Sequence, residues 1–138
     1  MAHKTTFLSL DVGEKRIGVA VGDSEVKIAI AYDTLDVDGT EYEQIARLIG
    51  LESADIVVVG YPRNQSGEPT AQTAYVETFA KGLKDMAPKI VFQDESLTSV
   101  LAEDRLKSMG KPYEKKDIDM FAASIILQDY MEQHDGRV

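Results

Sequence analysis

The sequence predicts an α/β fold with a mixed five-stranded sheet, three antiparallel strands followed by two parallel strands, and helices on both faces. Three short apolar runs joined by brief turns open the chain, which is typical of an antiparallel meander. Later apolar runs alternate with segments of helical periodicity, which indicates parallel strands joined by right-handed crossovers. The length of 138 residues is that of one domain, so we expect a single domain over residues 1–138.

The three opening strands are predicted over residues 5–11, 16–21 and 26–32. Each is a short run of mainly apolar side chains, and the turns between them contain Gly, Asp and Ser, which favour tight turns. Residues 33–40 are polar and are predicted to form a loop.

Two further strands are predicted at residues 55–60 and 89–93, which are the continuous apolar runs that parallel sheets bury on both faces. The predicted helices cover residues 41–52, 70–84, 98–108 and 117–133. Apolar side chains recur in them at helical spacing, and Gly110 and Pro112 stop the third helix.

The chain is acidic and contains no cysteine. Its 24 acidic and 15 basic residues give a net charge of −9, which argues against a general nucleic-acid binder that relies on Lys and Arg. Carboxylates that hold metal ions count as negative charge until the metal binds, so the sign is compatible with a nuclease. The lack of cysteine excludes disulfides and thiolate metal sites. No signal peptide or run of about 20 apolar residues is visible, so we expect a cytoplasmic protein with no membrane partner.

Acidic residues stand at the ends of two predicted strands. Asp11 ends the first strand, and Asp94 and Glu95 end the fifth. In an open α/β sheet, ligands bind beyond the carboxyl ends of the strands, so these acids are candidates for a shared site. The alternative is that they serve as ordinary turn residues. Either Asp94 or Glu95 could be the direct ligand.

A third acid, Asp119, lies in the last predicted helix. It shares a face with Ala122, Ala123 and Ile126, and a carboxylate in a packed stretch is costly unless a positive group meets it. A metal ion would do so. The alternative is a first-turn acid stabilised by the helix dipole, with Asp117 as the N-cap.

Oxygen-only ligands of this kind select hard cations such as Mg²⁺ or Mn²⁺. Two such cations held by a few carboxylates can activate water and stabilise the leaving oxygen of a phosphodiester. The chain has only two histidines, His3 and His134, so we do not expect a zinc site.

Four segments carry a resemblance to a known family. They are LDVGEKRIGVAVGD (10–23), VVGYPRNQSGEPT (58–70), DESLTS (94–99) and KKDIDMFAASIILQDYM (115–131). In this order they resemble the motifs of the YqgF/RuvX family of pre-16S rRNA nucleases, also called Holliday junction resolvase-like, over nearly the whole chain. The resemblance implies an RNase H-like fold and a nuclease that matures the 5′ end of 16S ribosomal RNA. It also implies that the family's catalytic acids are Asp11, Glu95 and Asp119. One departure is Ser96, which replaces the usual Arg and removes a fixed donor beside the expected site.

Basic side chains around these motifs are predicted to contact phosphate groups of the substrate. They are Lys15, Arg16, Arg63, Arg105, Lys111, Lys115 and Lys116. The alternative for each is ordinary solvated surface charge, and Arg16 could instead pair with a carboxylate.

The expected partner is structured RNA, pre-16S rRNA or a ribosomal particle that contains it. One alternative is a resolvase for branched DNA, which would have to act as a dimer because resolvases cut symmetrically. Another is a non-catalytic RNA- or ribosome-binding module. The sequence leaves a monomer or a weak dimer open. An ATP-binding relative of the sugar kinases would need a second lobe, for which the chain is too short.

Overall fold

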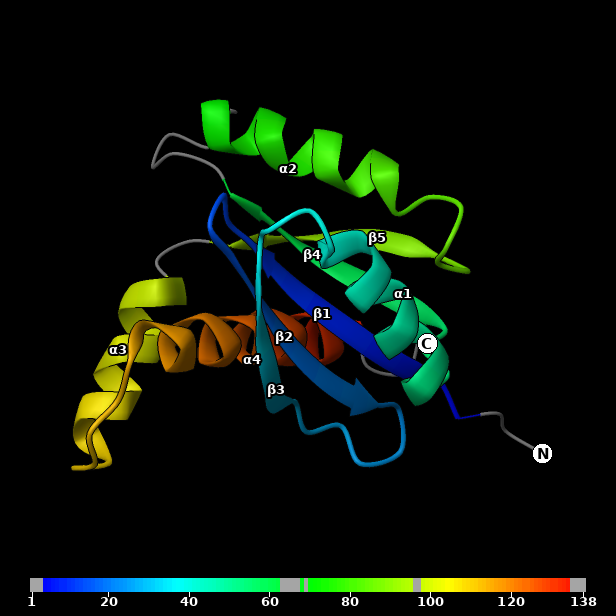
Figure 1. Ribbon diagram of the computed structural model, residues 1–138. Coiled ribbons are helices and arrows are strands. Elements are labelled where there is room, and N and C mark those ends of the chain that lie inside the picture. The colour runs from blue at the N-terminus through cyan, green and yellow to red at the C-terminus, as the bar shows by residue number, and fades with distance from the viewer. Residues whose placement is uncertain (1–3, 63–67, 69, 96–97, 135–138) are drawn as a thin grey trace.

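The computed structural model describes residues 4–62, 68, 70–95 and 98–134, and these contain one five-stranded sheet (Figure 1). The strands are β1 (Thr6–Val12), β2 (Arg16–Asp23), β3 (Ile30–Asp36), β4 (Ile56–Pro62) and β5 (Ile90–Glu95). The helices are α1 (Glu41–Glu52), α2 (Ala71–Gly82), α3 (Thr98–Ser108) and α4 (Lys115–Gln133). Their order along the chain is the predicted one.

The sheet has the strand order β3-β2-β1-β4-β5. β2 pairs antiparallel with β1 and β3, whereas β4 pairs parallel with β1 and β5, which confirms the predicted mixed sheet. β1, β4 and β5 therefore end at the same edge, at the left of Figure 1, where α4 begins. We call this the carboxyl edge, defined by Val12, Pro62 and Glu95 at the ends of the three strands.

Helices cover both faces of the sheet, as predicted. On one face, α1 and α2 pack against β-strand side chains such as Leu10 and Val59. On the other face, α4 packs against Phe7, Ala20 and Val58, and α3 packs on the outer side of α4. No helix within the described residues is long and apolar enough to cross a membrane.

The third strand lies later in the chain than predicted. The bounds expected for the strand at 26–32 and the loop at 33–40 are wrong, since β3 spans Ile30–Asp36. Residues 30–32 are in the strand and residues 37–40 are outside it, as predicted. The apolar alternation was misleading, because Val26 and Ile28 are 61% and 58% exposed. They belong to a turn in which the Asp23 carboxylate accepts from the backbone N–H of Val26 at 2.8 Å. The buried residues of β3 are instead Thr34 and Leu35.

Candidate functional site

Asp11 lies near the end of β1, on the face of the sheet that α4 covers. Side chains alternate between the two faces along a strand, and two positions earlier the Ser9 hydroxyl donates to the Ala123 carbonyl of α4 at 2.9 Å. The same alternation directs Asp11 toward the beginning of α4. Its side chain is half-buried.

Glu95, the last residue of β5, lies on the same face. Its register partner in β4 is Pro62, and its carboxylate reaches back over Gly60, two residues earlier on the same face. A Cβ built at Gly60 would lie 2.6 Å from Glu95 Oε2, so the glycine provides the space that the carboxylate occupies. The Thr98 hydroxyl, at the beginning of α3, donates to the same oxygen at 3.3 Å. Glu95 is thus held between β4 and α3 in a defined position.

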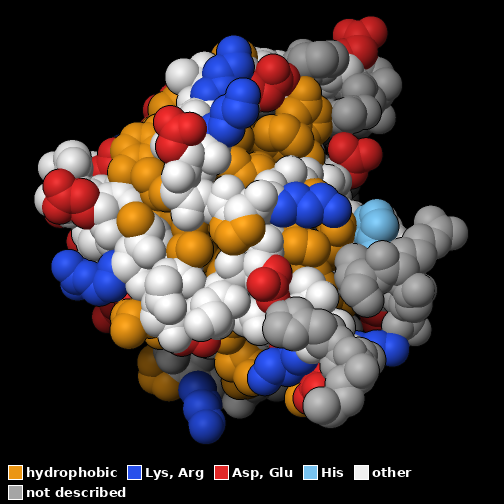
Figure 2. All heavy atoms as spheres, turned by 90° about the vertical axis from the view of Figure 1, so that its right-hand side faces the viewer, with side chains coloured by type: hydrophobic (Ala, Val, Ile, Leu, Met, Phe, Trp, Pro, Cys, Tyr) orange, Lys and Arg blue, Asp and Glu red, His pale blue; other side chains and the backbone are white. Residues whose placement is uncertain are grey.

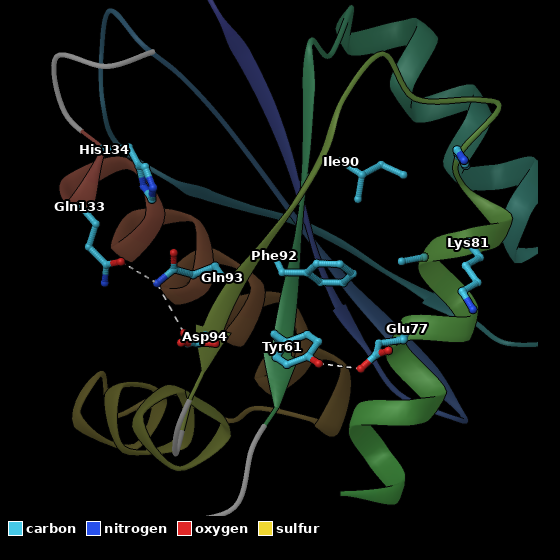
Figure 3. Close-up of a pocket in the computed structure, with 11 residues that line it drawn as sticks. Tyr61, Glu77, Lys81, Ile90, Phe92, Gln93, Asp94, Gln133 and His134 are labelled. Carbon is cyan, nitrogen blue, oxygen red and sulfur yellow. Dashed lines mark hydrogen bonds between the residues drawn. The ribbon is translucent and has the colours of Figure 1, made fainter. Parts of the chain in front are cut away.

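Asp94 occupies a different environment from Glu95. It is exposed and lines a cavity of about 810 Å³ beside the edge strand β5, together with Tyr61, Phe92 and Gln133 (Figure 3). None of the three candidate acids lines this cavity. Of the two acids that end β5, it is Glu95 whose charge acts on Asp11.

Asp119 is brought to the site by the close approach of α4 to β2. A Cβ at Gly18 of β2 would lie 1.9 Å from the Asp119 carbonyl oxygen, so only glycine permits this contact. The Asp119 carboxylate accepts a hydrogen bond from Arg16 Nε at 2.6 Å, and the two form an ion pair. The pairing of Arg16 with a carboxylate is thus the alternative that the structure adopts.

The alternative prediction, that Asp119 is a first-turn acid stabilised by the helix dipole with Asp117 as the N-cap, is wrong. α4 begins at Lys115, and its N-cap is Glu114 rather than Asp117. Asp117 is the third helical residue, and its carboxylate accepts from the Glu114 backbone N–H at 2.9 Å. Asp119 therefore lies beyond the first turn, and the positive group that it meets is the Arg16 guanidinium.

The three acids interact electrostatically. Burial, followed by the negative charges of Glu95 and Asp119, raises the pKa of Asp11 from 3.8 to about 8. Burial also raises the pKa of Glu95, against the opposing hydrogen bond from Thr98. Asp11 therefore requires a nearby positive charge to be ionised beside Glu95 and Asp119, and an all-oxygen set fits a hard divalent cation.

The side chains are not gathered around a common point. Among the described residues, no group of three or more His, Cys, Asp or Glu side chains is arranged to hold a metal ion. The direction of the Asp119 carboxylate contributes to this, since it faces Arg16. The carboxylate oxygens are therefore suitable ligands for a divalent cation. In the observed arrangement, however, the Asp119 carboxylate is paired with Arg16.

The predicted phosphate contacts fall into two groups. Lys15, Lys111, Lys115 and Lys116 are exposed. Lys15 lies in the β1–β2 turn and Lys115 and Lys116 lie in the first turn of α4, at the carboxyl edge, whereas Lys111 lies in the connection between α3 and α4. Lys116 Nζ also lies 3.7 Å from Asp36 Oδ2. The face opposite this edge shows Lys and Arg interspersed with acidic and apolar side chains (Figure 2).

Arg105 forms the second group. It is exposed in the last turn of α3, where its charge acts on Asp129 of α4. Asp129 follows Asp119 by ten residues on one helix, or about 15 Å. Arg63 and Ser96 lie outside the described residues.

Sequence reasoning missed Gly18, Gly60 and Thr98 as residues that shape the site. The signal for the glycines was present, because a glycine inside a strand indicates the close approach of another backbone or group. Thr98 carried no comparable signal, since it also fits an ordinary position at the beginning of a helix.

Comparison with known proteins places these features in a family. The RuvX family, described as Holliday junction resolvase, matches residues 5–133. A protein of Chloroflexus aggregans is 44% identical over 94% of this chain and 95% of its own length. A protein of Synechocystis is 36% identical over 96% of this chain and 90% of its own length. Both are named "Putative pre-16S rRNA nuclease".

Solved structures of resolvases share the fold at low sequence identity. The Fowlpox virus resolvase in complex with Holliday junction DNA has a TM-score of 0.61 at 16% identity, over 94% of this chain and 98% of that one. RuvC of T. thermophilus in complex with a Holliday junction substrate has a TM-score of 0.55 at 12% identity, over 94% of this chain and 95% of that one. The fold is therefore the RNase H-like fold of these enzymes, as the sequence motifs imply.

Proposed function

Because this chain belongs to the RuvX family, we propose that it is a metal-dependent nuclease that matures the 5′ end of pre-16S ribosomal RNA in the cytoplasm. We further propose that residues 1–138 form one nuclease domain. Its relatives of 36–44% identity carry the name of such a nuclease. The reaction is the hydrolysis of a phosphodiester bond.

The observation that carries the proposal is the raised pKa of Asp11, to which the charges of Glu95 and Asp119 contribute. Asp11, with a pKa of about 8, is influenced by both Glu95 and Asp119, although the three come from β1, β5 and α4. Such perturbed acids occur preferentially at functional sites. A purely structural acid would be better paired or replaced by a neutral residue, because burying unpaired charge is costly.

We propose Asp11, Glu95 and Asp119 as the ligands of two divalent cations, Mg²⁺ or Mn²⁺. When bound, such cations supply charge stabilisation and water activation for phosphodiester hydrolysis. The chain itself contributes three features. Asp11 offers a half-buried carboxylate at the strand end. Thr98 orients the Glu95 carboxylate, and Arg16 holds that of Asp119 in an ion pair.

The exposed lysines around the carboxyl edge are proposed to bind the phosphates on either side of the scissile bond. Lys15 lies in the turn after Asp11, and Lys115 and Lys116 lie within one turn of α4 before Asp119. Contacts to phosphate position a nucleic acid without reading its sequence. We propose the remaining candidates, Arg63, Arg105 and Lys111, as further phosphate contacts.

The proposal is tested with Asp11→Asn, assayed on an RNA that carries the 5′ flank of 16S rRNA, with Mg²⁺ or Mn²⁺. We expect at least a hundredfold loss of cleavage, on the order seen when an electrostatic element of an active site is removed. The matched control is Asp94→Asn, which removes an exposed acid one residue from Glu95. Undiminished cleavage by purified Asp11→Asn would refute the assignment. Metal-independent RNA binding without turnover in the wild type would indicate a non-catalytic binding module.

A second candidate function is the resolution of branched DNA, which the description of the family and the shared fold of the resolvases favour. The same variant pair, assayed on a synthetic four-way junction, separates the two substrates. Resolution requires symmetric cleavage by a dimer, so the assay is accompanied by sedimentation at the working concentration. Symmetric cuts by a dimer would favour junction DNA, and cleavage of the RNA by a monomer would favour the ribosomal substrate.

A further inference from the structure

The ion pair between Arg16 and Asp119 lies at the proposed metal centre. The 2.6 Å distance joins Arg16 Nε to Asp119 Oδ2, which is short even for a hydrogen bond between charged groups. The side chains are only 30% and 21% exposed, so solvent screens the pair less than it would at the surface. The guanidinium therefore neutralises one of the three acids.

The backbone holds the two partners in position. Arg16 is the first residue of β2, and Gly18, two residues later on the same face, allows the Asp119 carbonyl to approach the strand. On the other side of β2, Arg16 pairs in register with Asp36 of β3, whose carboxylate lies near Lys116. Asp119 is thus the carboxylate that the structure assigns to Arg16.

An Arg guanidinium and a divalent cation seek the same carboxylate oxygens. The Asp119 oxygen that accepts from Arg16 Nε, Oδ2, cannot keep this short hydrogen bond and bind a cation at full strength.

We propose that Arg16 is a positioning residue that competes with the divalent cation for the Asp119 carboxylate. In the metal-free enzyme it holds Asp119 and reduces the repulsion among the acids. When a cation takes Asp119, the guanidinium is released at the carboxyl edge, where it can bind a substrate phosphate. The two roles predicted for Arg16, a carboxylate partner and a phosphate contact, are then successive states of one side chain. This inference rests on the proposed metal centre.

The test is a calorimetric titration of the full-length protein with Mn²⁺ alone, without nucleic acid. Arg16→Gln removes the competing cation and is expected to tighten Mn²⁺ binding about tenfold, the effect of a strong, partly screened ion pair. Lys15→Gln, the matched loss of one positive charge in the adjacent exposed position, is expected to leave the affinity for Mn²⁺ unchanged. In an Asp119→Asn background, Arg16→Gln is expected to have no effect, because Arg16 acts through Asp119.

A second measurement needs no variant at position 16. In the wild-type protein, the NMR signal of the Arg16 Nε–H reports its hydrogen bond to Asp119. Titration with diamagnetic Mg²⁺ is expected to shift this signal and expose its proton to exchange, with the same midpoint as metal binding. This result is available even if Arg16→Gln does not fold.

The outcomes separate this inference from the proposed function. Three results would each refute the competition without refuting the metal centre. The first is unchanged or weaker Mn²⁺ binding by folded Arg16→Gln, and the second is an equal gain in Mn²⁺ affinity in Lys15→Gln or from Arg16→Gln in the Asp119→Asn background. The third is an NMR signal of Arg16 Nε–H that does not change when Mg²⁺ binds. If neither the wild type nor Arg16→Gln bound Mn²⁺, the metal centre itself would be refuted, and the competition with it.

Discussion

The raised pKa of Asp11 makes the stability of the metal-free protein depend on pH in a specific direction. The group takes up its proton with a pKa of about 8 in the folded state, against 3.8 ordinarily. Between these values the folded state binds more protons than the unfolded state, so the free energy of unfolding falls as pH rises from about 4 to 8. Above pH 8 the acid is ionised in both states and the loss is complete.

Asp11→Asn replaces this acid with a neutral side chain of the same shape. The difference in pKa of about 4 units corresponds to an upper limit of about 6 kcal/mol. Because the side chain is half-buried and water can relax around it, we expect a gain of about 2 kcal/mol at pH 9, or about 7 °C in Tm for a chain of this length. The gain should shrink toward zero at pH 4.

The assay is urea unfolding in EDTA at several pH values between 4 and 9, for the wild type, Asp11→Asn and the control Asp94→Asn. Asp94 is exposed, so its variant should follow the wild type. Addition of Mn²⁺ at pH 8 should stabilise the wild type and have little effect on Asp11→Asn, because a ligand stabilises only the state that binds it. A difference between the wild type and Asp11→Asn that is constant with pH would refute the reasoning.

Three other variants address the shape and the charge of the site. Gly60→Ala places a Cβ 2.6 Å from Glu95 Oε2, and the carboxylate can rotate away. We therefore expect a folded protein whose Mn²⁺ affinity, measured by calorimetry, and RNA cleavage are both reduced at least tenfold. Wild-type Mn²⁺ affinity would contradict this. Gly18→Ala meets the backbone carbonyl of Asp119 at 1.9 Å, which no rotamer can relieve, so we expect a loss of more than about 3 kcal/mol in urea unfolding; a loss below 1 kcal/mol would be inconsistent with the close contact. Lys115→Gln should weaken RNA binding and lower the slope of log K against log salt by roughly 0.7–0.9, as measured by fluorescence anisotropy, and an unchanged slope would show that this lysine contacts no phosphate.

The sequence by itself determined the order of the elements, the mixed sheet and the strand ends at which Asp11 and Glu95 stand. These depend on local patterns, because hydrophobic period and turn residues act over a few positions. The sequence did not determine the position of β3, since the apolar alternation over residues 26–32 is as typical of a strand as the pattern over residues 30–36. Burial of Thr34 and Leu35 decided that position, and burial depends on segments far away in the chain, such as the Lys116 carbonyl that accepts from Thr34 at 2.6 Å.

Only the tertiary structure showed how the surroundings of Glu95 and Asp94 differ and found the partner of Asp119. Adjacent residues of a strand point to opposite faces, so two neighbouring acids have different surroundings, and which face holds the site depends on where α4 packs. The Arg16–Asp119 pair joins positions 103 residues apart, and no local pattern indicates such a contact. The motifs could name the three acids, but the close packing of α4 on Gly18 decides that the Asp119 carboxylate binds Arg16.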